Sequence, residues 1–291
     1  MRLILGGSGF LGPALRAAMA PRTAFTYQAH PVPGGLYFDA RSSSVHALVE
    51  RLGERPSAAV ILLGITNIDA CAKEPAATAL VNVEGIVRVV DELRALGIVP
   101  VFTSSDAVFD GSHALWREDE AVQPVLTYGR QKLEVERYLS SLPPPWLIVR
   151  LPKLLSAVCD PRCMITGWVQ ALGRPERILC ATDQYFTPTG ADDAARGIEA
   201  LVSAGATGLY HLGGSERLSR LELLQVVVDE YSRHAAPRAE IVECRLGELP
   251  VFERRPLDLS MDSSRFIKRC GGILRPASVV ARAAVRAAVS G

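Results

Sequence analysis

Short runs of consecutive apolar residues alternate along the chain with longer segments in which apolar residues recur every three or four positions. The short runs predict strands buried on both faces, and the longer segments predict amphipathic helices. In the first half, strands are predicted at residues 2–5, 23–28, 36–38, 58–64, 99–105 and 146–151, and helices at residues 12–20, 44–52, 77–97 and 128–141. This alternation predicts an α/β fold with a doubly wound parallel sheet of the Rossmann type.

After Arg150 the alternation becomes less regular, and residues 153–185 are richer in proline, cysteine and charge. Ser219 and Glu222 have the spacing of a helix capping box. We expect a dinucleotide-binding domain at residues 1–152, with later contributions from about residues 186–212, and mainly a smaller C-terminal substrate-binding lobe at residues 153–291. Later helices are predicted at residues 191–205, 219–234 and 277–291, and a short strand at residues 208–214.

Composition narrows the class of protein. The chain has 291 residues, 48% of them hydrophobic, and a net charge of +1. A core of useful size can form, and no basic surface for nucleic acid or an anionic membrane is expected. No apolar run reaches the length of a membrane span, and the N-terminus reads as a strand rather than a secretory signal, so we expect a cytoplasmic protein. Cys159 and Cys163 form the one close cysteine pair and lack two further ligands at recognisable spacing, so no metal site is expected.

Gly6, Gly9 and Gly12 follow the first predicted strand and open the first helix. Glycines at this spacing let the backbone turn tightly and approach a pyrophosphate at the helix N-terminus. The pattern therefore predicts a dinucleotide site, and the alternative is a flexible N-terminal turn.

The predicted second strand ends near residues 27–30 without a carboxylate. An acidic residue there would bind the ribose 2′-hydroxyl of NAD, so its absence favours NADP over NAD, although no arginine stands there either. Asp39 and Ala40 follow the next strand. Asp39 has two interpretations: a contact at the adenine edge, or the cap of the helix that follows.

Tyr128 and Lys132 stand four residues apart on a predicted helix, so they share one face. A nearby ammonium is expected to lower the pKa of the tyrosine, which can then protonate a carbonyl oxygen as hydride reaches the carbon. Lys132 can also hydrogen-bond the ribose of the nicotinamide. Ser104 and Ser105, at the end of the strand at residues 99–105, supply a hydroxyl to hold the substrate oxygen.

Several segments resemble, in order, the landmarks of one family: GGSGFLG, GITNIDACAKEPAATALVNVEG, TSSDAVFDG, YGRQKLEVE, DQYFTPTGADDAARGI, GLYHLGGSERLSRLELLQ and RRPLDLSMDSSRF. The chain thereby resembles an extended short-chain dehydrogenase/reductase, most closely the dTDP-4-dehydrorhamnose reductase family. The resemblance covers nearly the whole chain.

This resemblance implies an NAD(P)H-dependent reductase of a keto sugar nucleotide. Ser105 would polarise the carbonyl, Tyr128 donate the proton, and Lys132 bind ribose and tune Tyr128. The implied cofactor contacts are Gly6, Gly9, Phe10, Leu11, Gly12, Asp39, Ala40, Leu63, Gly64, Thr66, Thr103, Tyr128 and Lys132, with NADP favoured over NAD. The implied substrate contacts are Ile68, Ser105, Asp106, Lys153 and Arg255; for Arg255 the alternative is a solvated arginine beside a proline.

The chain departs from the family pattern at two positions. Ala107 stands where the family usually has an aromatic residue, and Lys153 where it usually has a tryptophan that packs on the sugar. A cation at residue 153 suits an anionic or diphosphate group better than an apolar sugar face, and we expect Trp168 to pack in the core or lobe rather than to replace the missing tryptophan.

Two alternatives to the reductase stay open: a sugar-nucleotide epimerase that retains NAD, and a non-catalytic NADP-binding regulatory subunit, as in the methionine adenosyltransferase β subunit. A homodimer is among the assemblies that the class permits, and neither nucleic acid nor membrane is an expected partner.

Overall fold

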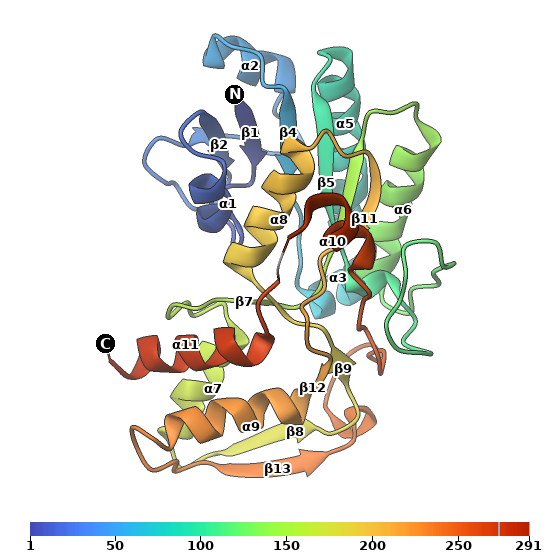
Figure 1. Ribbon diagram of the computed structural model, residues 1–291. Helices are drawn as coiled ribbons and strands as arrows, with labels where there is room; N and C mark the ends of the chain where they lie inside the picture. Colours follow the sequence, from blue (N-terminus) through green and yellow to red (C-terminus); the bar gives the residue numbers. More distant parts are fainter. Residues whose placement is uncertain (273, 291) are drawn as a thin grey trace.

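The computed structural model describes residues 1–272 and 274–290. Its largest sheet is built from β1 (Arg2–Leu5), β2 (Thr23–Tyr27), β3 (Leu36–Tyr37), β4 (Ala58–Ile61), β5 (Val99–Ser105), β6 (Leu147–Leu151) and β11 (Gly208–His211). The strands lie in the order β11-β6-β5-β4-β1-β2-β3, and all neighbours run parallel (Figure 1). The order reverses between β1 and β4, which opens a crevice at the carboxyl ends of these strands. The predicted doubly wound parallel sheet is confirmed.

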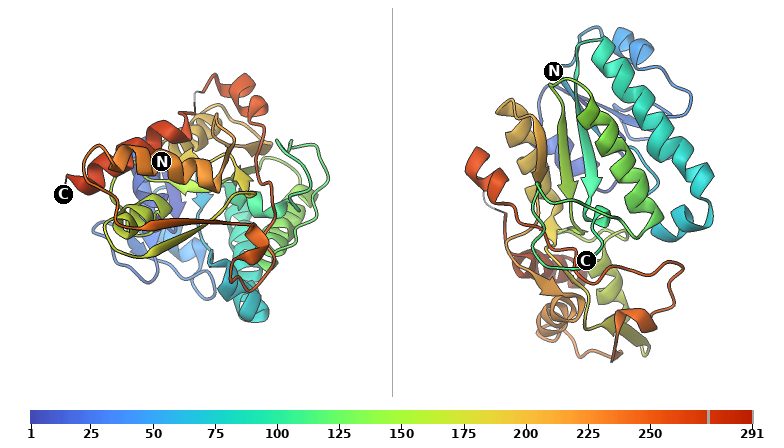
Figure 2. Two further views of the ribbon diagram at one scale, coloured as in Figure 1. Left: turned by 90° about the horizontal axis from the view of Figure 1, so that it is seen from below. Right: turned by 90° about the vertical axis from the view of Figure 1, so that its right-hand side faces the viewer.

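Helices cover both faces of this sheet, as Figure 2 shows in its edge-on view. One face carries α1 (Gly12–Ala18), α8 (Ala191–Ser203) and α10 (Ser264–Cys270). The other carries α2 (Val45–Leu52), α5 (Ile86–Ala95) and α6 (Thr127–Ser141). Leu3 and Leu5 pack on the second face and Ile4 on the first, because successive side chains of a strand point to opposite sides. Central strands such as β4 and β6 are thus buried on both sides, which explains their continuous apolar runs.

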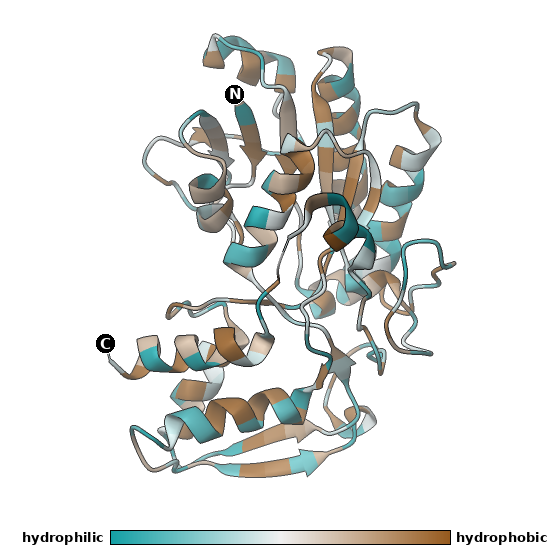
Figure 3. Cartoon of the chain, in the orientation of Figure 1, coloured by the Kyte–Doolittle hydropathy of each residue, from teal (hydrophilic) through white to brown (hydrophobic). Residues whose placement is uncertain are grey.

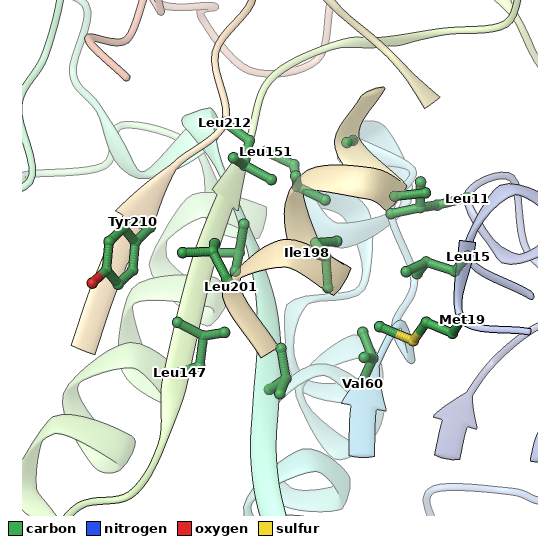
Figure 4. Close-up of a cluster of buried hydrophobic side chains, with 14 of the residues drawn as sticks. Leu11, Leu15, Met19, Val60, Leu147, Leu151, Ile198, Leu201, Tyr210 and Leu212 are labelled. Atoms are coloured by element: carbon green, nitrogen blue, oxygen red, sulfur yellow. The ribbon is translucent and has the colours of Figure 1, made fainter. Parts of the chain in front are cut away.

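The first of these cores joins segments far apart in the sequence. Figure 4 shows Leu11, Leu15 and Met19 of the α1 region facing Ile198 and Leu201 of α8 above the sheet. The contact explains why residues beyond 186 contribute to the sheet domain: α8 fills the face next to α1, and β11 then extends the sheet beside β6.

The predicted helix at residues 77–97 is α-helical at both ends and contains a π-helical turn between them. It comprises α4 (Pro75–Ala79), a π-helical turn (Leu80–Gly85) and α5. Such turns often accompany functional sites. Here the wider turn carries Asn82, which is completely buried and hydrogen-bonds to the loop after β4.

The second half forms a separate apolar cluster below the sheet in Figure 1. It is built from α7 (Met164–Leu172), α9 (Arg220–Tyr231), α11 (Ala277–Val289) and the parallel pair β8 (Arg177–Ala181) and β13 (Glu240–Cys244). Figure 3 shows hydrophobic residues along α9 and these strands. Trp168 is 7% exposed within this cluster, so its predicted role in lobe packing is confirmed. We call this part of the molecule the lobe.

Short elements lie between the lobe and the sheet. These are β7 (Leu154–Leu155) paired with β10 (Thr189–Gly190), and β9 (Tyr185–Phe186) paired with β12 (Leu218–Ser219). A further short helix, α3 (Ile68–Lys73), follows β4 and packs against α6. The helix α9 begins with the predicted capping box of Ser219 and Glu222. The predicted last helix ends at Val289, and its final residue, Gly291, lies outside the described residues. No helix among the described residues is long and apolar enough to cross a membrane.

Candidate active site

The carboxyl end of β5 turns sharply at Ser105. The Ser105 Oγ accepts a hydrogen bond from the Ala107 N–H at 3.2 Å and donates to the Asp106 carboxylate at 2.8 Å. Burial raises the pKa of Asp106 to about 6, against hydrogen bonds that favour its charge. Ser104 points to the opposite face of the strand, where its buried Oγ has no partner among the described residues. Of the two predicted serines, Ser105 therefore lies at the strand end where a substrate oxygen could bind.

The helix α6 places Tyr128 and Lys132 beside this turn, and both are buried. A Cβ on Gly129 would stand 1.9 Å from the Ala107 carbonyl oxygen. Only glycine permits this close approach of α6 to the end of β5. Gly129 is thus a positioning residue that sequence reasoning missed, although it lies within the YGRQK motif.

The pKa of Tyr128 is raised well above its ordinary value rather than lowered. Burial is the main cause, the charge of Asp106 adds to it, and hydrogen bonding with the Ser105 side chain opposes it. The expectation that Lys132 lowers this pKa is wrong, because the desolvation of the phenol dominates. Tyr128 consequently stays protonated at neutral pH and is suited to donating a proton.

Lys132 lies between Tyr128 and the loop after β4. Its Nζ donates to the Thr103 carbonyl at 3.0 Å and stands 5.6 Å from the Tyr128 ring. A Cβ on Gly64 would be 3.9 Å from the same Nζ. Burial lowers the pKa of Lys132 to about 8, although the charge of Glu136 one turn later favours the ammonium. Lys132 therefore connects the tyrosine to the crevice in which Gly64 lies.

This crevice contains a cavity of about 370 Å³. Its lining comes from the glycine loop, the ends of β2 and β3, and the loop after β4, namely Gly6, Ser8, Gly9, Gln28, Ala29, His30, Phe38, Asp39, Ala40, Arg41, Leu62, Leu63, Gly64, Ile65 and Val81. The backbone of Gly6 has φ +87°, a conformation that other residues rarely adopt. A cavity lined by a glycine turn and by a charged side chain suits a dinucleotide.

Some of the predicted cofactor residues line the cavity and others do not. Gly6, Gly9, Asp39, Ala40, Leu63 and Gly64 line the cavity. Gly12 instead packs against the loop, since a Cβ there would be 2.1 Å from the Gly7 carbonyl oxygen. Leu11 belongs to the core, and Phe10 and Thr66 do not line the cavity. Thr103 contributes through its contact with Lys132.

Asp39 and Arg41 both line the cavity. Arg41 bonds both oxygens of the Asp39 carboxylate, with Nη2 at 2.7 Å and Nε at 3.1 and 3.3 Å. This contact lowers the pKa of Asp39. Ser44, not Asp39, caps α2, so the helix-cap interpretation of Asp39 is wrong. Sequence reasoning searched for an arginine only after β2 and missed Arg41, which follows β3.

Asn82 holds the loop that lines the cavity beside Lys132. Its side chain accepts from the Ile65 N–H at 2.7 Å and donates to the Ile65 carbonyl at 3.0 Å and to Gln131 at 2.8 Å. Gln131 lies next to Lys132 on α6. Asn82 and Gln131 thus connect the loop after β4 to α6. The π-helical turn places Asn82 within hydrogen-bond distance of both.

The predicted substrate residues lie on the side of the turn that faces the lobe. Lys153 lies between β6 and β7, and its charge and backbone N–H act to lower the pKa of Asp106 against the larger effect of burial. Arg255 pairs with Asp69 of α3 at 2.5 Å, so the alternative of a solvated arginine is wrong. Ile68 begins α3 and packs in a small cluster with Tyr128.

Known proteins resemble this chain over most of its length. The family model described as RmlD substrate binding domain matches residues 1–287. The dTDP-4-dehydrorhamnose reductase of Sinorhizobium fredii is 26% identical over 95% of this chain and 93% of its own length. The methionine adenosyltransferase 2 subunit beta of Xenopus tropicalis is 24% identical over 91% of this chain and 81% of its own length.

Among solved structures, a dTDP-4-dehydrorhamnose reductase from Bacillus anthracis in complex with NADP superimposes with a TM-score of 0.84. It is 20% identical, and the match covers 96% of each chain. At this identity the comparison supports the fold.

Proposed function

This chain belongs to the RmlD substrate binding domain family, and from that membership and the geometry of the site we propose that it is an NADPH-dependent reductase of a keto sugar nucleotide. The observation that carries the proposal is the convergence of Ser105, Tyr128 and Lys132 next to the cavity of about 370 Å³. The relatives named dTDP-4-dehydrorhamnose reductase supply the substrate class.

NADPH, when bound, supplies a hydride to the keto carbon. The cavity lining and Lys132 would hold this cofactor. Ser105 positions the carbonyl oxygen by a hydrogen bond, and Tyr128 donates its proton to that oxygen as negative charge develops there. The ammonium of Lys132 stabilises the phenolate that remains. A buried, protonated Tyr128 supports the reductive direction.

A spectrophotometric assay tests the proposal. With dTDP-4-dehydrorhamnose as substrate, the nicotinamide absorbance of NADPH is expected to disappear stoichiometrically with the keto sugar. Binding of NADPH without consumption, across a panel of keto sugar nucleotides, would instead favour the regulatory role that the similarity to the methionine adenosyltransferase subunit suggests.

Arg41 is expected to set the preference for NADPH over NADH. It is the one lysine or arginine that lines the described cavity, and it screens the Asp39 carboxylate. Arg41→Ala removes a partner for the 2′-phosphate and uncovers a negative charge, so NADPH affinity should fall about tenfold, within the range of a charge-assisted hydrogen bond. Fluorescence titration with both cofactors measures the effect, with Arg51→Ala of α2 as control. An equal loss for NADPH and NADH would contradict this role.

The reduction rate should fall at alkaline pH. Lys132 has a pKa of about 8 and acts through its charged form, so kcat should decline as pH rises through that value. A pH–rate profile measures this. Lys132→Arg keeps its charge at high pH, so its profile should stay flat there whatever its absolute rate. A wild-type profile that is flat to pH 10 would refute the role of the ammonium.

A further inference from the structure

Three cations gather on the lobe side of the catalytic turn. Lys153 is exposed to solvent, yet burial by the surrounding protein is the main cause of its lowered pKa. The charges of Arg220 and Arg255 both act on Lys153 and disfavour its ammonium form. No carboxylate lies within ion-pairing distance of Lys153 in the part of the chain that the structure describes.

The two arginines have unused donors. Buried side-chain atoms without a hydrogen-bond partner are few in the described structure, and they include Arg220 Nε and Arg255 Nη1. Arg220 lies 5.3 Å from the ring of Trp168 and makes no ion pair among the described residues. Arg255 uses its Nη2 to form an ion pair with Asp69. Each guanidinium is therefore oriented by a neighbour and retains an unpaired, buried N–H.

Such an arrangement is unfavourable for stability. Like charges repel, and a buried donor without a partner loses its hydration without replacement. Clusters of this kind are typical of binding sites, where a ligand supplies the missing partner. The missing partner is an anion, since Lys153, Arg220 and Arg255 are all cations and all offer only hydrogen-bond donors.

The charge balance indicates what kind of anion fits. Asp69 neutralises Arg255, and Asp106 faces Lys153 as the largest favourable charge acting on it. Arg220 is left without a counter-charge. One unmatched positive charge corresponds to a single carboxylate, whereas a diphosphate carries two negative charges. Lys153 also lies beside Asp106 and Ser105, at the reacting end of the substrate rather than its nucleotide end.

We propose that the sugar of the substrate carries a carboxylate, which binds between Lys153 and Arg220 with Arg255 at its edge. The inference rests on the proposed reductase function and names its substrate class: keto derivatives of acidic sugars linked to a nucleoside diphosphate. It also gives a reason for a lysine at position 153, where an apolar sugar face would find no partner.

A matched pair of stable ligands tests this. UDP-glucose and UDP-glucuronate differ only at C6, and dTDP-glucose and dTDP-glucuronate repeat the comparison with another base. Calorimetric titration into the full chain with NADP⁺ present gives the affinity ratio within each pair. Because both members of a pair carry the same base, the effect of a poorly matched base on affinity drops out of this ratio. The acidic member should bind about tenfold more tightly, the magnitude of one charge-assisted contact.

Substitutions of the cations distinguish a contact with the sugar carboxylate from a contact with the diphosphate. Lys153→Met and Arg220→Met should each abolish the preference, and Lys268→Met, an exposed lysine of α10, should leave it unchanged. Equal binding of neutral and acidic ligands by the wild type would overturn the inference. Equal loss of both ligands in Lys153→Met would overturn it as well, since the lysine would then contact the diphosphate.

The proposed function has its own readout. A neutral keto sugar nucleotide could oxidise NADPH in a reaction that depends on Tyr128, while the acidic ligands bind no more tightly than the neutral ones. That result would support the reductase and refute the proposed carboxylate. Failure of all four ligands to bind would overturn the carboxylate, and the oxidation of NADPH would decide the reductase separately.

Discussion

Replacing Tyr128 by phenylalanine is expected to lower kcat by about 10²- to 10⁴-fold, the range that a positioned general acid contributes. The change removes one oxygen from a buried ring, and the hydroxyl is the group that lies next to Ser105 and would meet the substrate oxygen. Steady-state kinetics of NADPH oxidation measures the loss. The pH dependence near 8 that we assign to Lys132 should vanish with it, because no phenolate remains to be stabilised.

The same variant should bind NADPH as the wild type does, since Tyr128 does not line the described cavity and Lys132 is retained. Tyr138→Phe is the matched control: this tyrosine lies on the same helix and its hydroxyl contacts Asp91 away from the catalytic turn. If Tyr128→Phe turned over substrate as fast as the wild type, Tyr128 could not be the proton donor.

The second large effect is expected on stability. Glu136 binds Arg150 through two hydrogen bonds, at 2.7 and 3.0 Å, and both side chains are almost completely buried. Glu136→Ala leaves the guanidinium charge buried without a counter-charge. The free energy of unfolding should fall by about 3–5 kcal/mol, as is typical when one member of a buried pair is removed. Urea denaturation measures it.

The neighbouring histidine cannot replace the lost carboxylate. His211 is fully buried, and its pKa is lowered to about 3 by burial and by Arg150, so it is neutral. Its Nε2 accepts from Arg150 at 3.2 Å and its Nδ1 donates to the Trp116 carbonyl at 3.1 Å. Glu240→Ala breaks an exposed pair with Arg177 and serves as control, with little change expected. A similarly small effect of Glu136→Ala would contradict the account of this network.

Much of the sheet domain could be predicted because its signals are local. Strands such as β4 are runs of apolar residues, and the glycine loop and the Tyr128–Lys132 pair are short motifs whose spacing carries their geometry. The order of the strands then follows from general rules of α/β folds. Ser105 could be preferred over Ser104 only from the structure, because the two alternate between faces of one strand.

Features set by distant contacts could not be predicted. The π-helical turn accompanies the hydrogen bond between Asn82 and Ile65, and nothing in residues 77–97 alone reveals this contact. The strands β8 and β13 pair across about sixty residues and are partly exposed, so their apolar pattern is weak. Arg41 reaches the cavity from a two-residue strand, β3, that sequence reasoning did not search for an arginine. The pKa of Tyr128 was predicted in the wrong direction because burial was unknown.

The central claim is net hydride transfer to a keto sugar nucleotide. The most direct measurement uses NADPH deuterated at the transferring position of the nicotinamide, with mass spectrometry of the sugar product. The account predicts a reduced sugar nucleotide that carries one deuterium, formed in proportion to NADP⁺ and lost in Tyr128→Phe. An isomerised product without deuterium and without net NADPH oxidation would indicate an epimerase, and an unchanged substrate beside tightly bound NADPH would contradict the enzyme altogether.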